Sequence, residues 1–188
     1  MWTHAPTGLP LPALPPAAVR WLAPWRRRLT ARADLRGTRA WWSLFRTEGA
    51  TASSPRVVWS DFGRSPRAAV IAAGDPTVPL NSCYVLACPD LDDALALAAL
   101  LNSRLAAAWL NAIAEPARGG WHRYLGWTMS LLPLPSDWAR ARSILAPLAE
   151  RAACDSAPTD AELLDAVCRA YRLKRVDVAP LLAWEHRT

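Results

Sequence analysis

The hydrophobic and polar positions of this chain predict helices toward both ends and short strands between them. Over residues 19–36, hydrophobic residues recur three and four positions apart, as on one face of a helix, and arginines occupy many of the other positions. The hydrophobic face would hold Trp21, Leu22, Trp25, Leu29 and Ala33, and Gly37 would end the helix. Residues 1–16 are rich in proline and are predicted to form an extended arm or linker.

The middle of the chain has the pattern of β-strands. Residues 56–59, 68–72 and 83–87 are short apolar runs, and turn-forming residues at 74–76 and 79–82 separate the last two. We expect the second run to pair back on the first.

A hydrophobic stretch over residues 94–114 predicts a long central helix. Asp90 is placed to cap its N-terminus, and Asp92 and Asp93 put negative charge on the first turn, where the helix dipole favours it. Pro116 would end this helix, because proline cannot continue one.

The same stretch is hydrophobic enough to raise the question of a membrane span. Arg104 lies near its middle, and Asn102 and Asn111 flank that position; each would be costly in hydrocarbon. The N-terminal residues lack the basic region and unbroken apolar run of a signal peptide. We therefore expect the core helix of a soluble, cytoplasmic protein with no membrane partner.

The C-terminal part is predicted to be helical. Ser136 would cap a helix that Pro147 kinks or breaks. A capping-box pattern at 159–162 would begin another helix, which runs to Tyr171, and residues 177–184 would form a last short one. The predicted fold is α+β, a small mixed or antiparallel sheet with a long central helix and a C-terminal helical segment.

Composition adds a second signal, because the chain is basic and uses arginine almost exclusively. The 188 residues include 22 basic and 16 acidic side chains, a net charge of +6, and the only lysine is Lys174. The planar fork of arginine suits phosphate and guanine, so the composition fits a nucleic-acid partner. A GC-rich genome would give the same arginine excess, and both explanations stay open at this point.

Motifs for catalysis are absent from the sequence. It has no GxxxxGK phosphate loop, no GxGxxG after a strand, no HExxH, no GxSxG and no Asn- or Asp-Pro-Pro-aromatic motif for holding a flipped base. The aspartates at 90–93 are explained by the start of a helix. The cysteines lack zinc-site spacing and are expected to be buried and reduced: Cys83, Cys88, Cys154 and Cys168. We expect the chain alone to be catalytically inert, with no cofactor or metal; an unrecognised active site is the alternative.

One segment combines cationic and aromatic side chains next to two glycines. Its candidate DNA-contacting residues are Arg118, Gly119, Gly120, Trp121, His122, Arg123 and Tyr124. Arginine and aromatic side chains suit phosphates and base edges, and Arg64 and Arg67 after the first strand are candidates for the same surface. The alternative is a plain turn in which Trp121 and Tyr124 pack inward and the arginines are solvated.

Two further groups of residues remain open. The arginines at 26–28 form either a solvated helix face or an anchor for the DNA backbone. The tryptophans are expected to be core or interface anchors rather than base-stacking platforms: Trp21, Trp25, Trp41, Trp42, Trp59, Trp109 and Trp138.

Short motifs follow one another in a distinctive order along the chain. They lie at residues 25–29 with Arg32, 41–42, 55–59, 80–85, 101–103, 118–124, 132–135, 163–173 and 181–182. In this order they resemble the C-terminal specificity domain of TaqI-like N6-adenine DNA methyltransferases of type II restriction–modification systems. The resemblance covers nearly the whole chain from about residue 17.

The resemblance implies a target-recognition domain that binds double-stranded DNA and reads its sequence in a restriction–modification or phage-defence system. The catalytic half of such enzymes binds S-adenosylmethionine and methylates adenine N6, and that half is not on this chain. The resemblance therefore implies a methyltransferase catalytic domain or subunit as partner, with this chain either an excised domain or part of a split enzyme.

The predicted organisation is a linker at 1–16, a DNA target-recognition domain at 17–153 and a C-terminal helical appendage at 154–188. The alternative function is a protein-interaction or assembly subunit that does not itself contact DNA.

Overall fold

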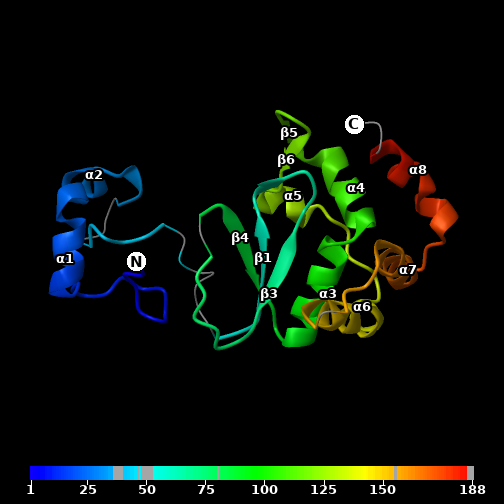
Figure 1. Cartoon of the computed structure of the whole chain (residues 1–188), viewed down its shortest axis with the longest axis horizontal. Helices are drawn as coiled ribbons and strands as arrows, with labels where there is room; N and C mark the ends of the chain where they lie inside the picture. Colours follow the sequence, from blue (N-terminus) through cyan, green and yellow to red (C-terminus); the bar gives the residue numbers. More distant parts are fainter. Residues whose placement is uncertain (36–39, 46, 48–52, 80, 155, 186–188) are drawn as a thin grey trace. The chain divides into compact units, whose positions relative to one another are not determined.

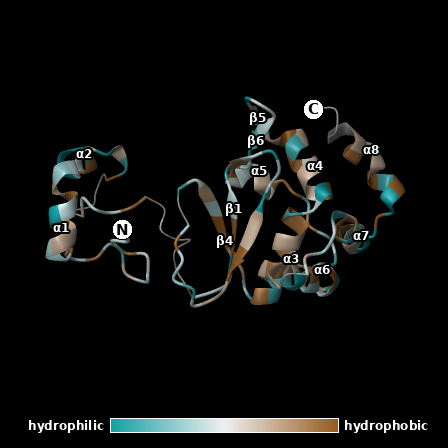
Figure 2. Ribbon diagram, in the orientation of Figure 1, coloured by the Kyte–Doolittle hydropathy of each residue, from teal (hydrophilic) through white to brown (hydrophobic). Residues whose placement is uncertain are grey.

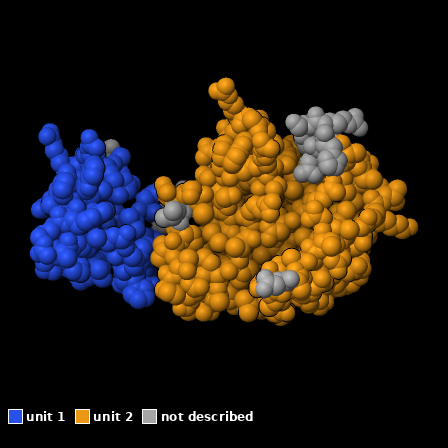
Figure 3. Space-filling view, in the orientation of Figure 1, with its two compact units in different colours: residues 1–52 blue, residues 53–188 orange. Residues whose placement is uncertain are grey.

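The chain forms two compact units, residues 1–52 (the first unit) and 53–188 (the second unit; Figures 1 and 3). The computed structural model describes residues 1–35, 40–45, 47, 53–79, 81–154 and 156–185. The expected helix end at Gly37 lies outside the described residues. The predicted α+β fold is confirmed, and its sheets are antiparallel.

In the first unit, the prediction of a single helix over residues 19–36 is wrong. The structure has helices α1 (Pro16–Leu22) and α2 (Arg26–Thr30), with one 3-10 turn, η1 (Ala23–Trp25), between them and another, η2 (Ala33–Leu35), after them. Pro24 explains the interruption, because it has no N–H to donate to the preceding turn.

The N-terminal residues of the first unit close a loop instead of extending as an arm. A bridge joins His4 to Pro10. The Thr3 hydroxyl donates to the Trp42 carbonyl at 3.0 Å, the Trp42 indole donates to the Leu11 carbonyl at 3.1 Å, and the Leu44 amide donates to His4 Nε2 at 3.1 Å. These hydrogen bonds tie residues 3–11 to residues 42–44, which is why the expectation of an extended segment is wrong.

The second unit begins with the predicted sheet. Strands β1 (Arg56–Ser60), β3 (Ala68–Ile71) and β4 (Cys83–Ala87) form at the predicted apolar runs, and β3 pairs back on β1 as predicted. The sheet is antiparallel in the order β3-β1-β4. Val57 and Trp59 of β1 are buried in the core that the sheet shares with the helices. In Figure 2 the hydrophobic colour is concentrated along these strands and along the neighbouring helix α3.

The predicted long helix at 90–116 is instead two helices, α3 (Leu91–Leu101) and α4 (Arg104–Ile113), bent by 68°. Asp90 caps α3 as predicted. The break comes from tertiary contacts: the Asn102 carboxamide donates to the Ala68 carbonyl and accepts from the Ala68 amide, both at 2.8 Å, and so pairs with the edge strand β3. Ser103 then caps α4.

Within the described part of the chain, no single helix is both long and apolar enough to cross a membrane. The bent pair α3 and α4 meets that test by length and composition only when the two are taken together.

Three longer helices lie toward the C-terminus of the second unit: α6 (Trp138–Ala153), α7 (Asp160–Tyr171) and α8 (Arg175–Glu185). The capping box of α7 is confirmed, with both Thr159–Glu162 hydrogen bonds present. One detail of α6 differs from prediction, because Asp137 rather than Ser136 caps it. Of the predicted kink or break at Pro147, the break does not occur, since Pro147 lies inside the helix. Helix α6 packs against α3 and α7, and these tertiary contacts offset the cost of the proline.

The helices after residue 154 thus belong to the same compact unit as the strands, and the structure divides at 52/53. The domain boundaries at 16/17 and 153/154 remain a prediction about roles.

The four cysteines are free thiols, as expected, although they are not all buried. Cys88 and Cys168 are buried, and this burial raises the pKa of each thiol. Cys83 is half-buried, and Cys154, at the end of α6, is exposed, so the prediction of burial is wrong for Cys154.

Candidate nucleic-acid interface

The candidate segment at 118–124 is part of a second small sheet that the sequence did not predict. Strands β5 (Glu115–Ala117) and β6 (Trp121–Arg123) form a hairpin, and β2 (Phe62–Gly63) pairs with β6, so the order is β2-β6-β5. Figure 1 shows this hairpin at the top of the second unit, near helices α4 and α5 (Gly126–Ser130).

The two glycines shape the turn between β5 and β6. Gly119 has φ of 81° and Gly120 has φ of 71°, both in the left-handed region that favours glycine. A Cβ on Gly120 would meet nothing within 4 Å, so glycine is required there by backbone conformation and not by crowding. The turn therefore exposes its backbone and the neighbouring Arg118 at the tip of the hairpin.

An exposed aromatic pair lies on this sheet. The rings of Phe62 and Trp121 stack with centroids 4.9 Å apart and planes inclined by 23°. Phe62 is 43% exposed and Trp121 38% exposed, so both rings remain accessible from solvent. Trp121 thus lies at the surface, as expected for a contact residue.

Tyr124 is placed differently from the prediction, because its side chain is fully buried. Its hydroxyl donates to Asn111 Oδ1 at 2.6 Å, its amide donates to the Asp61 carbonyl at 2.8 Å, and its carbonyl accepts from the Trp59 indole at 2.9 Å. These bonds join the hairpin to α4 and β1. Tyr124 therefore supports the hairpin from the interior, and its expected place on the contact surface is corrected.

His122 is half-buried on the middle strand of this sheet. Its ring lies 6.5 Å from that of Tyr124, and Nδ1 has no hydrogen-bond partner among the described residues. Burial lowers the pKa of His122 below its ordinary value. This shift favours the neutral form of the ring.

The four arginines of the site are all exposed but have different neighbours. Arg118, Arg64 and Arg67 are exposed, and Arg123, also exposed, lies 3.7 Å from the Asp61 carboxylate. Arg64 directly follows β2, and its carbonyl accepts a hydrogen bond from Asn111 Nδ2 at 3.3 Å, which places it beside the hairpin. Arg67 immediately precedes β3 in the other sheet, so the structure groups it less closely with the hairpin.

Sequence reasoning missed three residues of this site. Phe62 completes the aromatic pair, Asp61 balances part of the charge of Arg123, and Asn111 orients both Tyr124 and Arg64. The one signal available was the Phe-Gly-Arg sequence at 62–64, which places an aromatic residue and a cation around a glycine as in residues 118–121.

We name five of these residues the hairpin surface: Phe62, Arg64, Arg118, Trp121 and Arg123. It combines cations and flat rings, and two acidic residues lie next to Arg123: the Asp61 carboxylate is 3.7 Å away, and Glu115 is the cross-strand neighbour of Arg123 on β5. No group of three or more potential metal-binding side chains occurs in the described residues. The arrangement suits binding to phosphates and base edges.

Comparison with known proteins adds no family assignment: no protein-family model matches the chain, and no curated protein matches it. The resemblance to methyltransferase specificity domains therefore depends on the ordered motifs themselves.

Proposed function

We propose that this protein binds double-stranded DNA through the hairpin surface and recognises a target sequence for an adenine-specific DNA methyltransferase. The catalytic domain or subunit, with its S-adenosylmethionine, would lie outside this chain. The observation that supports this best is the stacked Phe62–Trp121 pair beside Arg64, Arg118 and Arg123 on an exposed hairpin.

The physical roles differ along this surface. Arginines that reach phosphates fix the register of the protein on the duplex, and one that reaches a guanine edge makes a bidentate contact that distinguishes base pairs. Arg118, at the tip beside two glycines, is best placed to enter a groove. Tyr124 and Asn111 hold the hairpin against α4, so the reading residues keep a defined position.

Binding would also help the catalytic partner. Extruding an adenine from the duplex costs a few kcal/mol, and contacts on the surrounding DNA can offset that cost. In this proposal the present chain contributes the contacts and the partner contributes the chemistry.

The test is selection of preferred sequences from a pool of randomised duplexes. The full chain should enrich one sequence, and a variant with Arg118→Ala and Arg123→Ala should lose the preference at the positions those residues read, about 1–3 kcal/mol for each bidentate contact. The control is Arg151→Ala with Arg172→Ala, which also removes two exposed arginines; these two lie near carboxylates, as Arg123 does. Equal sequence preference in all three proteins would contradict the proposal.

A second candidate function has one supporting observation. Trp127, Leu131 and Leu134 follow the hairpin and are each more than half exposed, as in a surface that docks a protein partner. If the chain serves only in assembly, it will show no affinity for duplex DNA at low salt, and Trp127→Ala will disrupt its complex with a partner.

A further inference from the structure

The net positive charge of this protein comes from its first unit. Residues 1–52 contain eight arginines and two carboxylates, whereas residues 53–188 contain 14 basic and 14 acidic side chains. The net charge of +6 therefore belongs entirely to the first unit, and the second unit, with the hairpin surface, is formally neutral.

The described arginines of the first unit lie mainly on its two helices. Arg20 is exposed on α1, and Arg26, Arg27 and Arg28 are consecutive exposed residues of α2. Successive helical residues point about 100° apart, so these three side chains surround much of the helix. Within the described residues, none of these four arginines forms an ion pair, whereas Arg32 lies 3.7 Å from Asp34.

Aromatic rings hold two of these cations in place. The guanidinium of Arg26 lies 5.4 Å from the centroid of the Trp41 ring, and that of Arg28 lies 5.9 Å from the Trp25 ring. A guanidinium over a ring face keeps its N–H groups free at the edge for a phosphate. Trp21 is 63% exposed and Trp25 50% exposed, so neither is a core residue, and for these two the prediction of core or interface anchors is left with the interface role.

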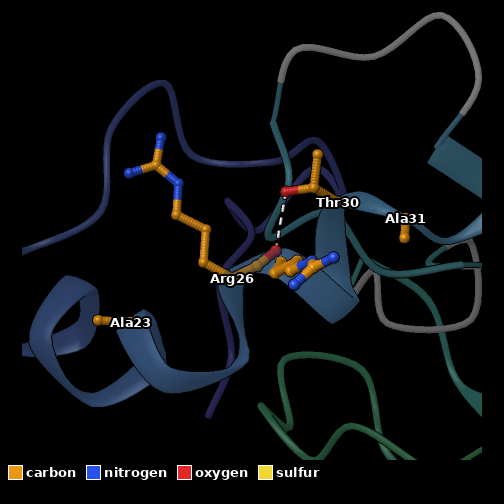
Figure 4. A pocket seen from close by; sticks show the side chains of 5 residues that line it. Ala23, Arg26, Thr30 and Ala31 are labelled. Atoms are coloured by element: carbon orange, nitrogen blue, oxygen red, sulfur yellow. Dashed lines mark hydrogen bonds between the residues drawn. The ribbon is translucent and has the colours of Figure 1, made fainter.

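Small side chains leave room between the arginines. A shallow hollow on α2 is lined by Ala23, Arg26, Arg27, Thr30 and Ala31. Figure 4 shows the Arg26 side chain extending away from the helix. The Thr30 hydroxyl donates a hydrogen bond to the Arg26 carbonyl at 2.8 Å. The lining of this hollow thus combines two cationic side chains with small ones, a composition that suits an anionic group on a neighbouring surface.

We infer that the first unit is a second DNA-binding surface, which contacts the phosphate backbone of duplex DNA and does not read its sequence. A polyanion is favoured over a protein partner because the charge excess is nearly uncompensated. Backbone contact is favoured over base reading because α2 has five residues and is only about 7.5 Å long, too short to follow a groove. The choice of a duplex as ligand rests on the proposed function of the second unit.

The test measures the affinity of the full chain for a random-sequence duplex across salt concentrations. Each phosphate contact contributes about 0.9 to the slope of log affinity against log salt. A variant with Arg26→Gln, Arg27→Gln and Arg28→Gln should therefore lower that slope by about 2–3. Its affinity for random and for selected duplexes should fall by the same factor, because no base contact is lost.

Two controls separate this effect from general charge loss. Arg151→Gln with Arg169→Gln and Arg172→Gln removes the same charge from exposed positions of the C-terminal helical region and should leave the slope unchanged. The variant with lysines at positions 26, 27 and 28 keeps the charge and should restore most of the slope. Circular dichroism of each variant checks that the helices are intact.

The results of this experiment distinguish failure of this inference from failure of the proposed function. Two results would overturn the phosphate surface while leaving recognition by the hairpin intact. One is an unchanged slope in the variant with glutamines at 26–28; the other is a decrease in slope seen only with single-stranded DNA of the same length. Conversely, the variant with glutamines at 26–28 could show the expected decrease in slope while the unmodified chain shows no sequence preference. That result would support this surface and contradict the hairpin proposal. A chain that binds no duplex at any salt concentration would overturn both.

Discussion

The first and second units are stabilised in different ways. The second unit has a continuous core of strands and helices, with Val57, Leu100, Leu110, Leu145 and Val167 fully buried. Among the described residues of the first unit, the buried hydrophobic side chains are Leu14 and Ala18, and hydrogen bonds from residues 3–11 to residues 42–44 hold its loop closed.

Charge follows the opposite distribution, since the unit with little core has all of the net positive charge. Like charges repel within a compact unit, and a polyanion relieves that repulsion. Reading a base sequence needs a surface held in place by a rigid scaffold, whereas attraction to phosphates needs less exact placement. In our proposal, the well-packed unit provides specificity and the basic unit provides affinity.

The largest expected effect comes from truncating a core residue of the second unit, and an exposed ring of the first unit serves as the comparison. Leu145→Ala removes a fully buried side chain and should lower the free energy of unfolding by about 2–5 kcal/mol. Trp21→Ala removes a mostly exposed ring and should change it by less than about 0.5 kcal/mol. Urea denaturation followed by circular dichroism measures both; equal losses would show that Trp21 is part of a core.

Tyr124→Phe tests the link between core and hairpin. It deletes the hydroxyl that donates to Asn111 Oδ1, and we expect a loss of about 1–3 kcal/mol in unfolding free energy. Trp121→Phe is the control, because Trp121 lies at the surface and should affect DNA binding more than stability. A Tyr124→Phe protein as stable as the original would contradict the interior role of Tyr124.

Gly120→Ala tests the turn itself. A left-handed backbone costs about 1–2 kcal/mol in a residue with a Cβ, and the position has open space, so the whole effect should be conformational. Gly126→Ala is the comparison, since Gly126 has no positive φ and its added Cβ would lie 3.4 Å from the Tyr84 ring. Thermal unfolding should show the larger loss for Gly120→Ala; a reversed order would contradict this account of the turn.

The smallest expected effect is a pH dependence of the first unit. His4 Nε2 accepts a hydrogen bond from the Leu44 amide, and burial lowers the pKa of His4. The pKa of His4 in the folded protein lies below the ordinary value of about 6.5. The contribution of neutral His4 to the stability of the first unit is therefore present above pH 6.5 and is lost as the pH falls through the folded pKa. Exchange of the Leu44 amide, corrected for intrinsic rates, should therefore accelerate toward pH 5. His4→Gln should abolish this dependence, and an unchanged dependence in that variant would exclude His4 as its source.

The sequence predicted the elements whose signals are local. The apolar runs of β1, β3 and β4 and the Thr159–Glu162 capping box were sufficient, since strand patterns and capping bonds involve near neighbours. The break between α3 and α4 was not predictable in this way, because it depends on Asn102 pairing with β3 far along the chain.

The candidate site shows the same limit. Its cationic and aromatic residues were identified from their clustering at 118–124, but strands of two or three residues containing proline and glycine give no alternating pattern. The burial of Tyr124 and the stacking of Phe62 on Trp121 follow from pairing between β2 and β6, which only the folded chain brings together.

The most direct test of this division is chemical modification of arginine side chains in the full chain, read by mass spectrometry with and without a selected duplex. We predict that DNA protects Arg118 and Arg123 of the hairpin surface together with Arg26–Arg28 of α2, while Arg151, Arg169 and Arg172 stay reactive. Random-sequence DNA should protect the α2 arginines but protect those of the hairpin less. Hairpin arginines that remain as reactive with the selected duplex as without it would contradict the account.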